Sequence, residues 1–336
     1  MAETKPLRRK RILSGMRPTG RLHLGNLVGA LWNWRDLQDA FDCFFMIADY
    51  HALMSEYASP AGIADASREV LIDFLSCGLD PERSVIFRQS DLPEHAELHL
   101  ILSCYTPISW CERNPTYKKQ MEQLTAKDIH NYAFLGYPVL QAADIVIYKA
   151  NVVPVGEDQL PHLELTREVV RRFNNLVGRE VLVEPQAKLT ESPLLLGLDG
   201  RKMSKTLRNQ IDITESPEVL QKKVMSMFTD PLRIRLADPG HPDDCNVCQY
   251  YKVFDPNAYE DVADKCRHSK WGCTDCKRRL GEVLVTFLSE PREKRAELEA
   301  HPERLREILD QGAERARKAA RATLDEIKEL VGLGEL

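Results

Sequence analysis

The chain has 336 residues, of which 43% are hydrophobic, enough for a sizeable core in two domains or in one large α/β domain with an appendage. No stretch approaches the roughly 20 apolar residues of a membrane helix, and no apolar signal core follows the basic residues 1–11, so we expect a cytoplasmic protein. The net charge of −5 excludes a globally basic nucleic-acid binder. Contacts with nucleic acid would need local basic groups, as at residues 167–172, 277–279 and 315–318, each equally typical of a solvated helix face.

Strands and helices alternate through the first half of the chain. Residues 43–48 form a continuous apolar run, which is typical of a central parallel strand buried on both faces. Between residues 23 and 40 the apolar residues recur at helical spacing. The expected strands are 10–14, 43–48, 84–87 and 151–155, and the expected helices are 23–40, 64–77, 137–148 and 162–173. This order predicts the α/β class with a Rossmann-like, doubly wound parallel sheet.

The pattern becomes mostly helical in the last third of the chain. Ser216 and Pro217 have the residue types of a helix N-cap and a first helical position. We place a domain boundary near residues 207–212, with a Rossmann-like domain over residues 1–207 and a C-terminal α-helical domain over residues 208–336.

A short motif at the start of the first expected helix has the features of a phosphate site. It reads His23-Leu24-Gly25-Asn26. Gly25 lets a ligand approach the backbone closely, and the free N–H groups of a helix start favour anions. His23 and Asn26 can donate hydrogen bonds to phosphate oxygens, as the transfer of a nucleotide requires. Alone, this motif would be better explained as a helix N-terminus with a surface histidine.

A second motif, from Lys202 to Thr206, places two lysines three residues apart in a loop that Gly197 and Gly200 introduce. Two ammonium groups on a movable loop can close over a triphosphate and stabilise the transition state more than the ground state. The alternative is a basic surface loop, which the presence of the first motif disfavours. We therefore expect His23, Asn26, Lys202 and Lys205 to be the catalytic residues.

In this order, the two motifs resemble the "HIGH" and "KMSKS" signatures of class I aminoacyl-tRNA synthetases. The blocks at residues 14–20, 48–52, 137–145 and 153–159 resemble those of bacterial tryptophanyl-tRNA synthetases, and the similarity runs over nearly the whole chain. This resemblance implies that residues 1–207 are catalytic and that residues 208–336 bind the anticodon. The ATP contacts it implies are Arg17, Pro18, Thr19, Gly25, Asn26, Gly156, Glu157, Asp158, Lys202, Met203, Ser204 and Lys205.

The resemblance also implies a pocket for tryptophan. An indole needs an apolar slot and one acceptor, because its N–H group is a donor only. Asp144 would supply the acceptor, and Val153 and Val155 would line the slot. His51 and Gln159 would lie near the substrate's ammonium and carboxylate groups. Two positions that border this pocket, Gln141 and Leu13, depart from the residues that some family members carry.

Tyrosine is the nearest alternative substrate. Its phenol could also donate to Asp144, and tyrosyl-tRNA synthetases share the fold. The block at residues 153–159 favours tryptophan, whereas the lone aspartate does not discriminate.

The nine cysteines fall into two groups. Four are scattered and are interpreted as small buried hydrophobic residues: Cys43, Cys77, Cys104 and Cys111. The other five crowd into residues 245–276, as in a metal-binding segment of a cytosolic protein.

Two interpretations of the cysteine segment compete. The pairs Cys245/Cys248 and Cys273/Cys276 have the spacing of a four-cysteine zinc ribbon. Alternatively, Cys245, Cys266, Cys273 and Cys276 resemble the ligands of a [4Fe-4S] cluster in a subset of tryptophanyl-tRNA synthetases, although the first gap differs in length. Thiolates suit both metals, and we favour the cluster over Zn²⁺.

The resemblance implies a two-step reaction in a homodimer. ATP, with Mg²⁺, activates L-tryptophan to tryptophanyl-adenylate, and the tryptophanyl group passes to tRNA(Trp). Positioning and charge stabilisation carry the chemistry, without a covalent nucleophile. The alternatives are a tyrosyl-tRNA synthetase, a plain nucleotidyltransferase, which the helical domain disfavours, and a non-catalytic paralogue that senses tryptophan or adenylate, which the intact motifs disfavour.

Overall fold

The computed structural model describes residues 9–123, 131–189 and 193–334. A five-stranded parallel sheet has the order β3-β2-β1-β4-β5. Its strands are β1 (Arg11–Met16), β2 (Asp42–Ile47), β3 (Val85–Arg88), β4 (Val152–Val155) and β5 (Gln186–Leu189). The Rossmann-like α/β class is therefore confirmed, and the strand order reverses direction between β1 and β4.

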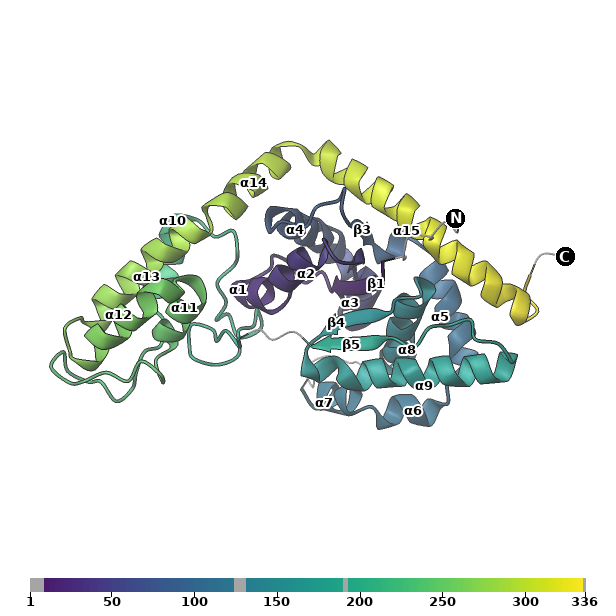
Figure 1. Ribbon diagram of the computed structural model, residues 1–336, viewed down its shortest axis with the longest axis horizontal. Helices are drawn as coiled ribbons and strands as arrows, with labels where there is room; N and C mark the ends of the chain where they lie inside the picture. The colour runs from purple at the N-terminus through teal and green to yellow at the C-terminus, as the bar shows by residue number, and fades with distance from the viewer. Residues whose placement is uncertain (1–8, 124–130, 190–192, 335–336) are drawn as a thin grey trace, which may run out of the picture.

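Helices surround the sheet and continue beyond it (Figure 1). The α-helices of the first part are α1 (Leu24–Asn26), α2 (Trp32–Leu37), α3 (Asp49–Glu56), α4 (Ile63–Ser76), α5 (Glu94–Tyr105), α6 (Ile108–Arg113), α7 (Pro115–Gln123), α8 (Tyr132–Ile147) and α9 (Leu160–Val177). Those that follow are α10 (Pro217–Met225), α11 (Asn246–Phe254), α12 (Pro256–Arg267), α13 (Cys273–Phe287), α14 (Ser289–Ala300) and α15 (Pro302–Leu330). A π-helical segment, η1 (Leu27–Leu31), joins α1 to α2, and short 3-10 turns are η2 (Pro60–Gly62), η3 (Gln89–Asp91) and η4 (Glu157–Gln159). In the segments that the structure describes, no helix is both long and apolar enough to cross a membrane.

The expected elements match the observed ones closely in the first half of the chain. Strand β2 is buried on both faces, as its apolar run predicts: Phe45 and Ile47 belong to one hydrophobic cluster, and Phe44 and Met46 belong to the other. The Ser216 side chain accepts a hydrogen bond from the amide of Val219, which confirms the predicted N-cap of α10. Strand β5 lies outside the expected strands, because three of its four residues are exposed and leave no apolar run.

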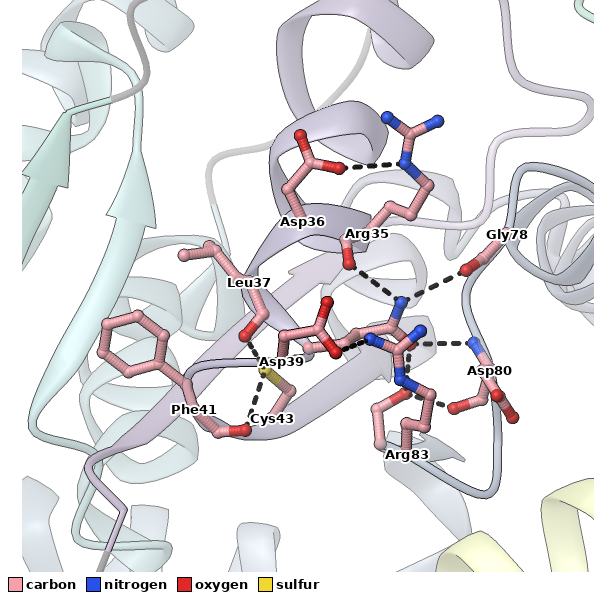
Figure 2. Close-up of polar contacts among 11 residues, drawn as sticks. Arg35, Asp36, Leu37, Asp39, Phe41, Cys43, Gly78, Asp80 and Arg83 are labelled. Atoms are coloured by element: carbon pink, nitrogen blue, oxygen red, sulfur yellow. Dashed lines mark hydrogen bonds and ion pairs between the residues drawn. The ribbon is translucent and has the colours of Figure 1, made fainter.

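A buried glutamine joins α2 to the segment that precedes β3. Gln38 is 1% exposed, and its amide donates to the carbonyls of Arg35 and Gly78 and accepts from the amide of Asp80 and the hydroxyl of Ser84. Figure 2 shows this junction, together with the Arg83–Asp39 ion pair. All four hydrogen-bonding positions of the amide are satisfied, as a buried polar group requires.

The prediction that the scattered cysteines are buried holds for three of them. Cys43, Cys77 and Cys111 are buried, and the Cys43 thiol donates to the carbonyls of Leu37 and Phe41 (Figure 2). Burial raises the pKa of Cys43 to about 12. The prediction is wrong for Cys104, which is exposed, because it lies on the solvent side of α5.

The chain returns to the sheet at its C-terminal end. Helix α14 packs against α4, and α15 packs along β3 and α5, as Figure 1 shows. The buried side chains of α15 include Ala316, Ala320 and Ile327, which belong to the same hydrophobic cluster as Phe44. The boundary near residues 207–212 stays a prediction, and the last helix of the segment beyond it covers the sheet.

Gly312 permits the close approach of α15 to β3. A Cβ atom at this position would overlap the carbonyl oxygen of Ile86. In an open helix, alanine would stabilise the chain by about 1 kcal/mol relative to glycine, but overpacking against backbone costs about 1–3 kcal/mol.

We predict that Gly312→Ala lowers the free energy of unfolding by up to about 2 kcal/mol, the overpacking cost less the helix-propensity gain, measured by urea denaturation. Gly62→Ala is the matched control, because a Cβ atom there meets no atom within 4 Å. A Gly312→Ala protein as stable as the wild type would show that α15 does not pack this closely in solution.

Candidate active site

A cavity of about 370 Å³ opens at the carboxyl ends of β1, β2 and β4. This is the place where the strand order reverses, and open α/β sheets bind their ligands there. The volume falls in the usual range of small-molecule sites. Gly29 and Ala30 of the π-helical segment η1 line one side of it.

The cavity brings together eight of the predicted site residues. They are Arg17, His51, Gln141, Asp144, Val153, Val155, Gly156 and Gln159. Leu13 also lines it, as expected of a pocket border. The remaining predicted residues of the nucleotide motifs lie outside this cavity.

Asp144, on helix α8, is the most buried charged group of the cavity, with 1% of its surface exposed. Its Oδ1 accepts from Gln89 Nε2 at 2.8 Å and from His95 Nδ1 at 2.7 Å, and its Oδ2 accepts from His51 Nε2 at 2.7 Å. Burial alone would raise the pKa of Asp144, but the hydrogen bonds from His51 and His95 hold it below its ordinary value. The carboxylate is therefore ionised at neutral pH and acts only as an acceptor.

The position of these partners leaves one acceptor site in the cavity. A carboxylate offers about four acceptor positions, two on each oxygen. Gln89 and His95 occupy both positions of Oδ1, and neither of them lines the cavity. Since, of the residues that the structure describes, only His51 bonds to Oδ2, one position on Oδ2 remains for a donor in the cavity.

Tyr137 and His162 also line the cavity, and the expected site residues do not include them. The Tyr137 hydroxyl lies 2.6 Å from His162 Nε2, and His162 Nδ1 lies 3.1 Å from Asn114 Nδ2. The sequence block that begins at Tyr137 could have indicated this tyrosine as a site residue. No spacing in the sequence indicates that His162 lies next to it.

The hydrogen-bonded chain Tyr137–His162–Asn114, which we call the relay, has hydrogen-bond geometry that indicates which ring nitrogen of His162 carries the proton. Asn114 Oδ1 accepts from the amide of Thr116 at 2.9 Å, so the Asn114 NH₂ group faces His162 and donates to Nδ1. Burial and His51 lower the pKa of His162 to about 4, so the ring is neutral at pH 7. His162 therefore carries its proton on Nε2 and donates to the Tyr137 oxygen, which leaves the phenol proton to be donated elsewhere.

Residues of the His23 motif hydrogen-bond to one another. Asn26 Oδ1 accepts from the His23 amide at 3.1 Å, and His23 Nδ1 accepts from the Asn26 amide at 3.3 Å, in a capping box. The Leu24 amide donates to the Ile211 carbonyl at 2.9 Å. The expectation that these amides are free for an anion is therefore wrong for His23, Leu24 and Asn26, because the chain itself satisfies them.

The side chain of His23 keeps a donor for a phosphate. Burial and the charge of Lys205 lower the pKa of His23 to about 4, so the ring is neutral at pH 7. Since Nδ1 accepts from the Asn26 amide, the proton lies on Nε2. Gly25 leaves room for the His23 ring, because a Cβ atom at this position would crowd Nδ1 at 3.0 Å.

The lysine loop and the segment that follows it lie beside the first motif. Residues 22–24 and 211–213 pair through the Leu24–Ile211 bond and a bond of 3.0 Å from the Ile213 amide to the Leu22 carbonyl. Lys205 Nζ donates to the carbonyl and hydroxyl oxygens of Thr19 at 3.1 and 3.3 Å. The structure thus brings two motifs that are about 180 residues apart in the sequence to one place.

Asn209, which is 3% exposed, holds the lysine loop in shape. Its Oδ1 accepts from the Ser204 amide at 2.8 Å, and its Nδ2 donates to Asp199 at 2.7 Å and to the Lys202 carbonyl at 3.2 Å. Met203 is buried beside the first motif. Asn209 lies outside the Lys202–Thr206 motif, and the expected site residues do not include it.

The family described as tRNA synthetases class I (W and Y) matches residues 5–289. The chain belongs to this family. It is 45% identical over 326 residues to the tryptophan–tRNA ligase of Thermotoga maritima, covering 96% of this chain and 99% of that one. The crystal structure of the tryptophanyl-tRNA synthetase of Campylobacter jejuni, complexed with ADP and tryptophan, has a TM-score of 0.88 at 37% identity and covers 96% and 100% of the two chains. The tyrosyl-tRNA synthetase of Archaeoglobus fulgidus, with a TM-score of 0.66 and 21% identity, shares the fold.

The five clustered cysteines of this synthetase surround a second, small cavity. Cys245, Cys248, Cys266, Cys273 and Cys276 all line it, together with Thr229, Arg233, Val247, Val262 and Trp271. The neighbouring Cys248 thiol and burial raise the pKa of Cys245. Within residues 9–123, 131–189 and 193–334, no group of three or more His, Cys, Asp or Glu side chains is arranged to hold a single metal ion.

The basic groups at residues 167–172 and 315–318 are largely engaged within the chain. Arg167 and Arg171 bond to the Pro185 carbonyl and to Glu184, respectively. Arg315 donates to the carbonyls of Pro81 and Ser84, and Arg317 donates to the carbonyl of Asp91. These arginines hydrogen-bond helix α9 to residues 184–185 and helix α15 to residues 81–91.

We predict that His162 is neutral with its proton on Nε2 over the range from pH 5.5 to pH 8, because its pKa is lowered to about 4. Long-range ¹⁵N–¹H NMR of the histidine rings measures the tautomer, and His162→Gln assigns the signal. A proton on Nδ1, or protonation of this ring near pH 6.5, would contradict the relay.

Proposed function

We propose that this synthetase is a tryptophan–tRNA ligase, which activates L-tryptophan with ATP and transfers it to tRNA(Trp). The observation that carries the proposal is the single remaining acceptor position on Asp144 Oδ2, in a cavity that Val153, Val155 and other apolar side chains line together with polar ones. An indole N–H is a lone donor on an apolar ring, and it matches this arrangement. The relatives support the same substrate, because the ligase of Thermotoga maritima and the complex of Campylobacter jejuni both carry tryptophan in their names.

In the proposed tryptophan site, the indole lies between Val153 and Val155 and donates to Asp144. Gln141 borders the ring, and His51 and Gln159 lie near the α-ammonium and α-carboxylate groups. Tyr137, whose phenol proton is not consumed by His162, can donate to the carboxylate or accept from the ammonium group. The buried relay behind Tyr137 fixes its orientation without a further cost when the substrate binds.

In the first step, a carboxylate oxygen of tryptophan attacks the α-phosphorus of ATP. The new P–O bond forms as the bond to the β-phosphate oxygen breaks, and Mg²⁺-pyrophosphate leaves. His23, Asn26, Lys202 and Lys205 would donate to the phosphate oxygens on which charge develops, which is positioning and electrostatic stabilisation. The other ATP contacts we propose are Arg17, Pro18, Thr19, Gly25, Gly156, Glu157, Asp158, Met203 and Ser204.

In the second step, the ribose hydroxyl of the terminal adenosine of tRNA attacks the carbonyl carbon of the adenylate. AMP leaves with the bonding electrons, and the hydroxyl proton passes to the leaving phosphate or to solvent. The hydrogen bond from Lys205 to Thr19 supports a lysine loop that reaches across the proposed triphosphate site. Because the loop is anchored at Asn209, we propose that it closes over the phosphates as a unit.

Tyrosine remains the substrate against which the proposal is tested. The Asp144 acceptor alone would serve a phenol as well, and the family as described includes both W and Y enzymes. We predict that amino-acid-dependent ATP–pyrophosphate exchange proceeds with tryptophan and not measurably with tyrosine. Asp144→Asn should lower kcat/KM for tryptophan by about 10- to 100-fold, since a hydrogen bond to a charged group contributes about 1.5–3 kcal/mol.

The control for this variant is Asp49→Asn. Asp49 is also a buried carboxylate at the same edge of the sheet and accepts from Tyr50 and Ser90, but it does not line the cavity. We expect its KM for tryptophan to stay within about threefold of the wild type. Exchange with tyrosine in preference to tryptophan, or an Asp144→Asn enzyme with unchanged kcat/KM, would refute the proposed site.

We also propose a [4Fe-4S] cluster at the cysteine-lined cavity, held by Cys245, Cys266, Cys273 and Cys276. The donor set fits, because five thiols surround one hollow and thiolates are the ligands of such clusters. When bound, a cluster would cross-link the segment before α11 to helices α12 and α13.

Arg233 supports this proposal because its guanidinium lies 3.9 Å from Cys266 Sγ and donates to the Trp271 carbonyl at 2.8 Å. A cation beside the thiols stabilises their deprotonated form, which is the form that binds metal. Zn²⁺, with Cys248 as a fourth ligand in place of Cys266, is the alternative.

We predict that the protein purified without oxygen is brown, with a broad band near 400 nm (roughly where thiolate-to-iron charge transfer falls) and about four irons per chain. Cys266→Ser should lower the iron content, and Cys248→Ser should not. A colourless protein with about one zinc per chain, which loses its metal in Cys248→Ser, would instead establish the zinc site.

We propose that the synthetase is a cytoplasmic homodimer. Helices α5, α6 and α8 pack on one another and leave Leu100, Ile108 and Tyr132 exposed, each with more than half of its surface in solvent. Exposed apolar side chains on adjacent helices are typical of a protein interface. Light scattering should give a molar mass of twice 38.4 kDa, and a monomer at micromolar concentration would contradict the proposal.

A further inference from the structure

A buried ionic cluster joins the helical part of the chain to the sheet domain. Arg295 lies on α14 and Asp73 lies on α4, and they are 4% and 0% exposed. Arg295 Nη1 donates to Asp73 Oδ1 at 3.1 Å, Nη2 donates to Glu69, and Nε lies 2.8 Å from Glu299 Oε1. A buried arginine with three carboxylates is a strongly held group, because removing one member leaves an uncompensated charge.

The second oxygen of Asp73 holds the backbone beside the first phosphate motif. Asp73 Oδ2 accepts from the Leu22 amide at 2.6 Å. Leu22 directly precedes His23, and its carbonyl accepts from Ile213, which lies in the segment beyond the lysine loop. One carboxylate therefore fixes the point where the two nucleotide motifs meet.

Arg21 provides a second link between the residues that precede His23 and the ionic cluster. Its Nε donates to Glu69 at 2.9 Å, so that Glu69 accepts from both Arg21 and Arg295. The two residues before His23 are thus tied by separate contacts to the cluster that Arg295 completes. Within the part of the chain that the structure describes, no contact of this cluster involves a residue that lines the tryptophan cavity.

We infer that Arg295 is a positioning residue for ATP, which couples helix α14 to the His23 motif through Asp73 and the Leu22 amide. This inference rests on the proposed function, because it assigns ATP to the motifs at residues 23–26 and 202–206. Arg295 does not line the tryptophan cavity and lies outside both nucleotide motifs. It acts by keeping Asp73 ionised, so that Asp73 accepts the hydrogen bond from the Leu22 amide directly before His23.

The charge balance at Asp73 supports this role. Burial raises the pKa of Asp73 to about 6, and the Leu22 amide and Arg295 act in the opposite direction. Without Arg295, the buried carboxyl would have the Leu22 amide as its main stabilising partner and would be protonated nearer to neutral pH. A protonated carboxyl is a weaker acceptor, so the Leu22 bond would loosen.

The test compares Arg295→Met and Arg295→Lys with Lys294→Met. Lys294 is the matched control, because it lies on the same helix and makes an exposed ion pair with Glu290 at 2.6 Å. The KM values for ATP and for tryptophan are measured separately in pyrophosphate exchange. Hydrogen exchange of the Leu22 amide is followed in the same proteins by mass spectrometry with fragmentation.

For Arg295→Met, we expect KM for ATP to rise about tenfold, KM for tryptophan to stay within about twofold, and the Leu22 amide to exchange at least about tenfold faster. Arg295→Lys should recover most of both effects, since it retains the charge beside Asp73. Lys294→Met should resemble the wild type. A purely structural role would lower the active fraction and leave both KM values unchanged.

Equal changes in the two KM values, or an unchanged Leu22 exchange rate in Arg295→Met, would overturn the inference. If Arg295→Met does not fold, Asp73→Asn carries the same test with the same expected results, because its neutral amide oxygen is a weaker acceptor for the Leu22 amide and its NH₂ group cannot accept from Arg295. Absence of exchange activity in the wild type would refute the proposed function, whereas the Leu22 exchange rates would still decide whether Arg295 holds this segment.

Discussion

The ionised carboxylate of Asp144, almost fully excluded from water, is the constraint around which the active site is built. A buried charge must be neutralised by hydrogen bonds, and Asp144 receives them from His51 on α3, Gln89 on η3 and His95 on α5. Three separate elements are thereby fixed relative to α8. The same three bonds consume all but one acceptor position, so the requirement that stabilises the fold also defines what the cavity can recognise.

The nucleotide side of the site depends on a different kind of constraint. The pairing of residues 22–24 with 211–213 uses backbone hydrogen bonds, and it holds the segment that follows the lysine loop beside the helix start. His23 and Asn26 are preorganised by their mutual capping bonds, which leaves His23 Nε2 as a donor. Preorganised donors stabilise developing charge effectively, because they do not reorient during the reaction.

Two contacts, one apolar and one ionic, join the helical part of the chain to the sheet domain. Trp32 packs against Phe254 and Phe287, with ring centroids 5.9 Å apart in both pairs, and extends the core of the sheet domain into the helices beyond residue 245. Arg295 adds a charged link from α14 to the backbone at Leu22. The apolar contact is tolerant of small displacements, whereas the ionic link is directional, so the two contacts have different consequences when α14 moves.

The sequence by itself determined the features that depend on local periodicity and local chemistry. The apolar run at residues 43–48, the helical spacing, the cap at Ser216 and the two nucleotide motifs predict the α/β fold, and the resemblance to known synthetases indicated the residues around the cavity. Only the tertiary structure decided that the amides of the His23 motif are already bonded, that Tyr137 and His162 form a relay, and that α15 returns to β3. It also decided that the residues bonded to Asp144 include Gln89 and His95. These features join residues that are far apart along the chain, such as Asp73 and Arg295 at a separation of 222. Which distant side chains must neutralise one another follows from how the chain closes on itself, and no local pattern encodes it.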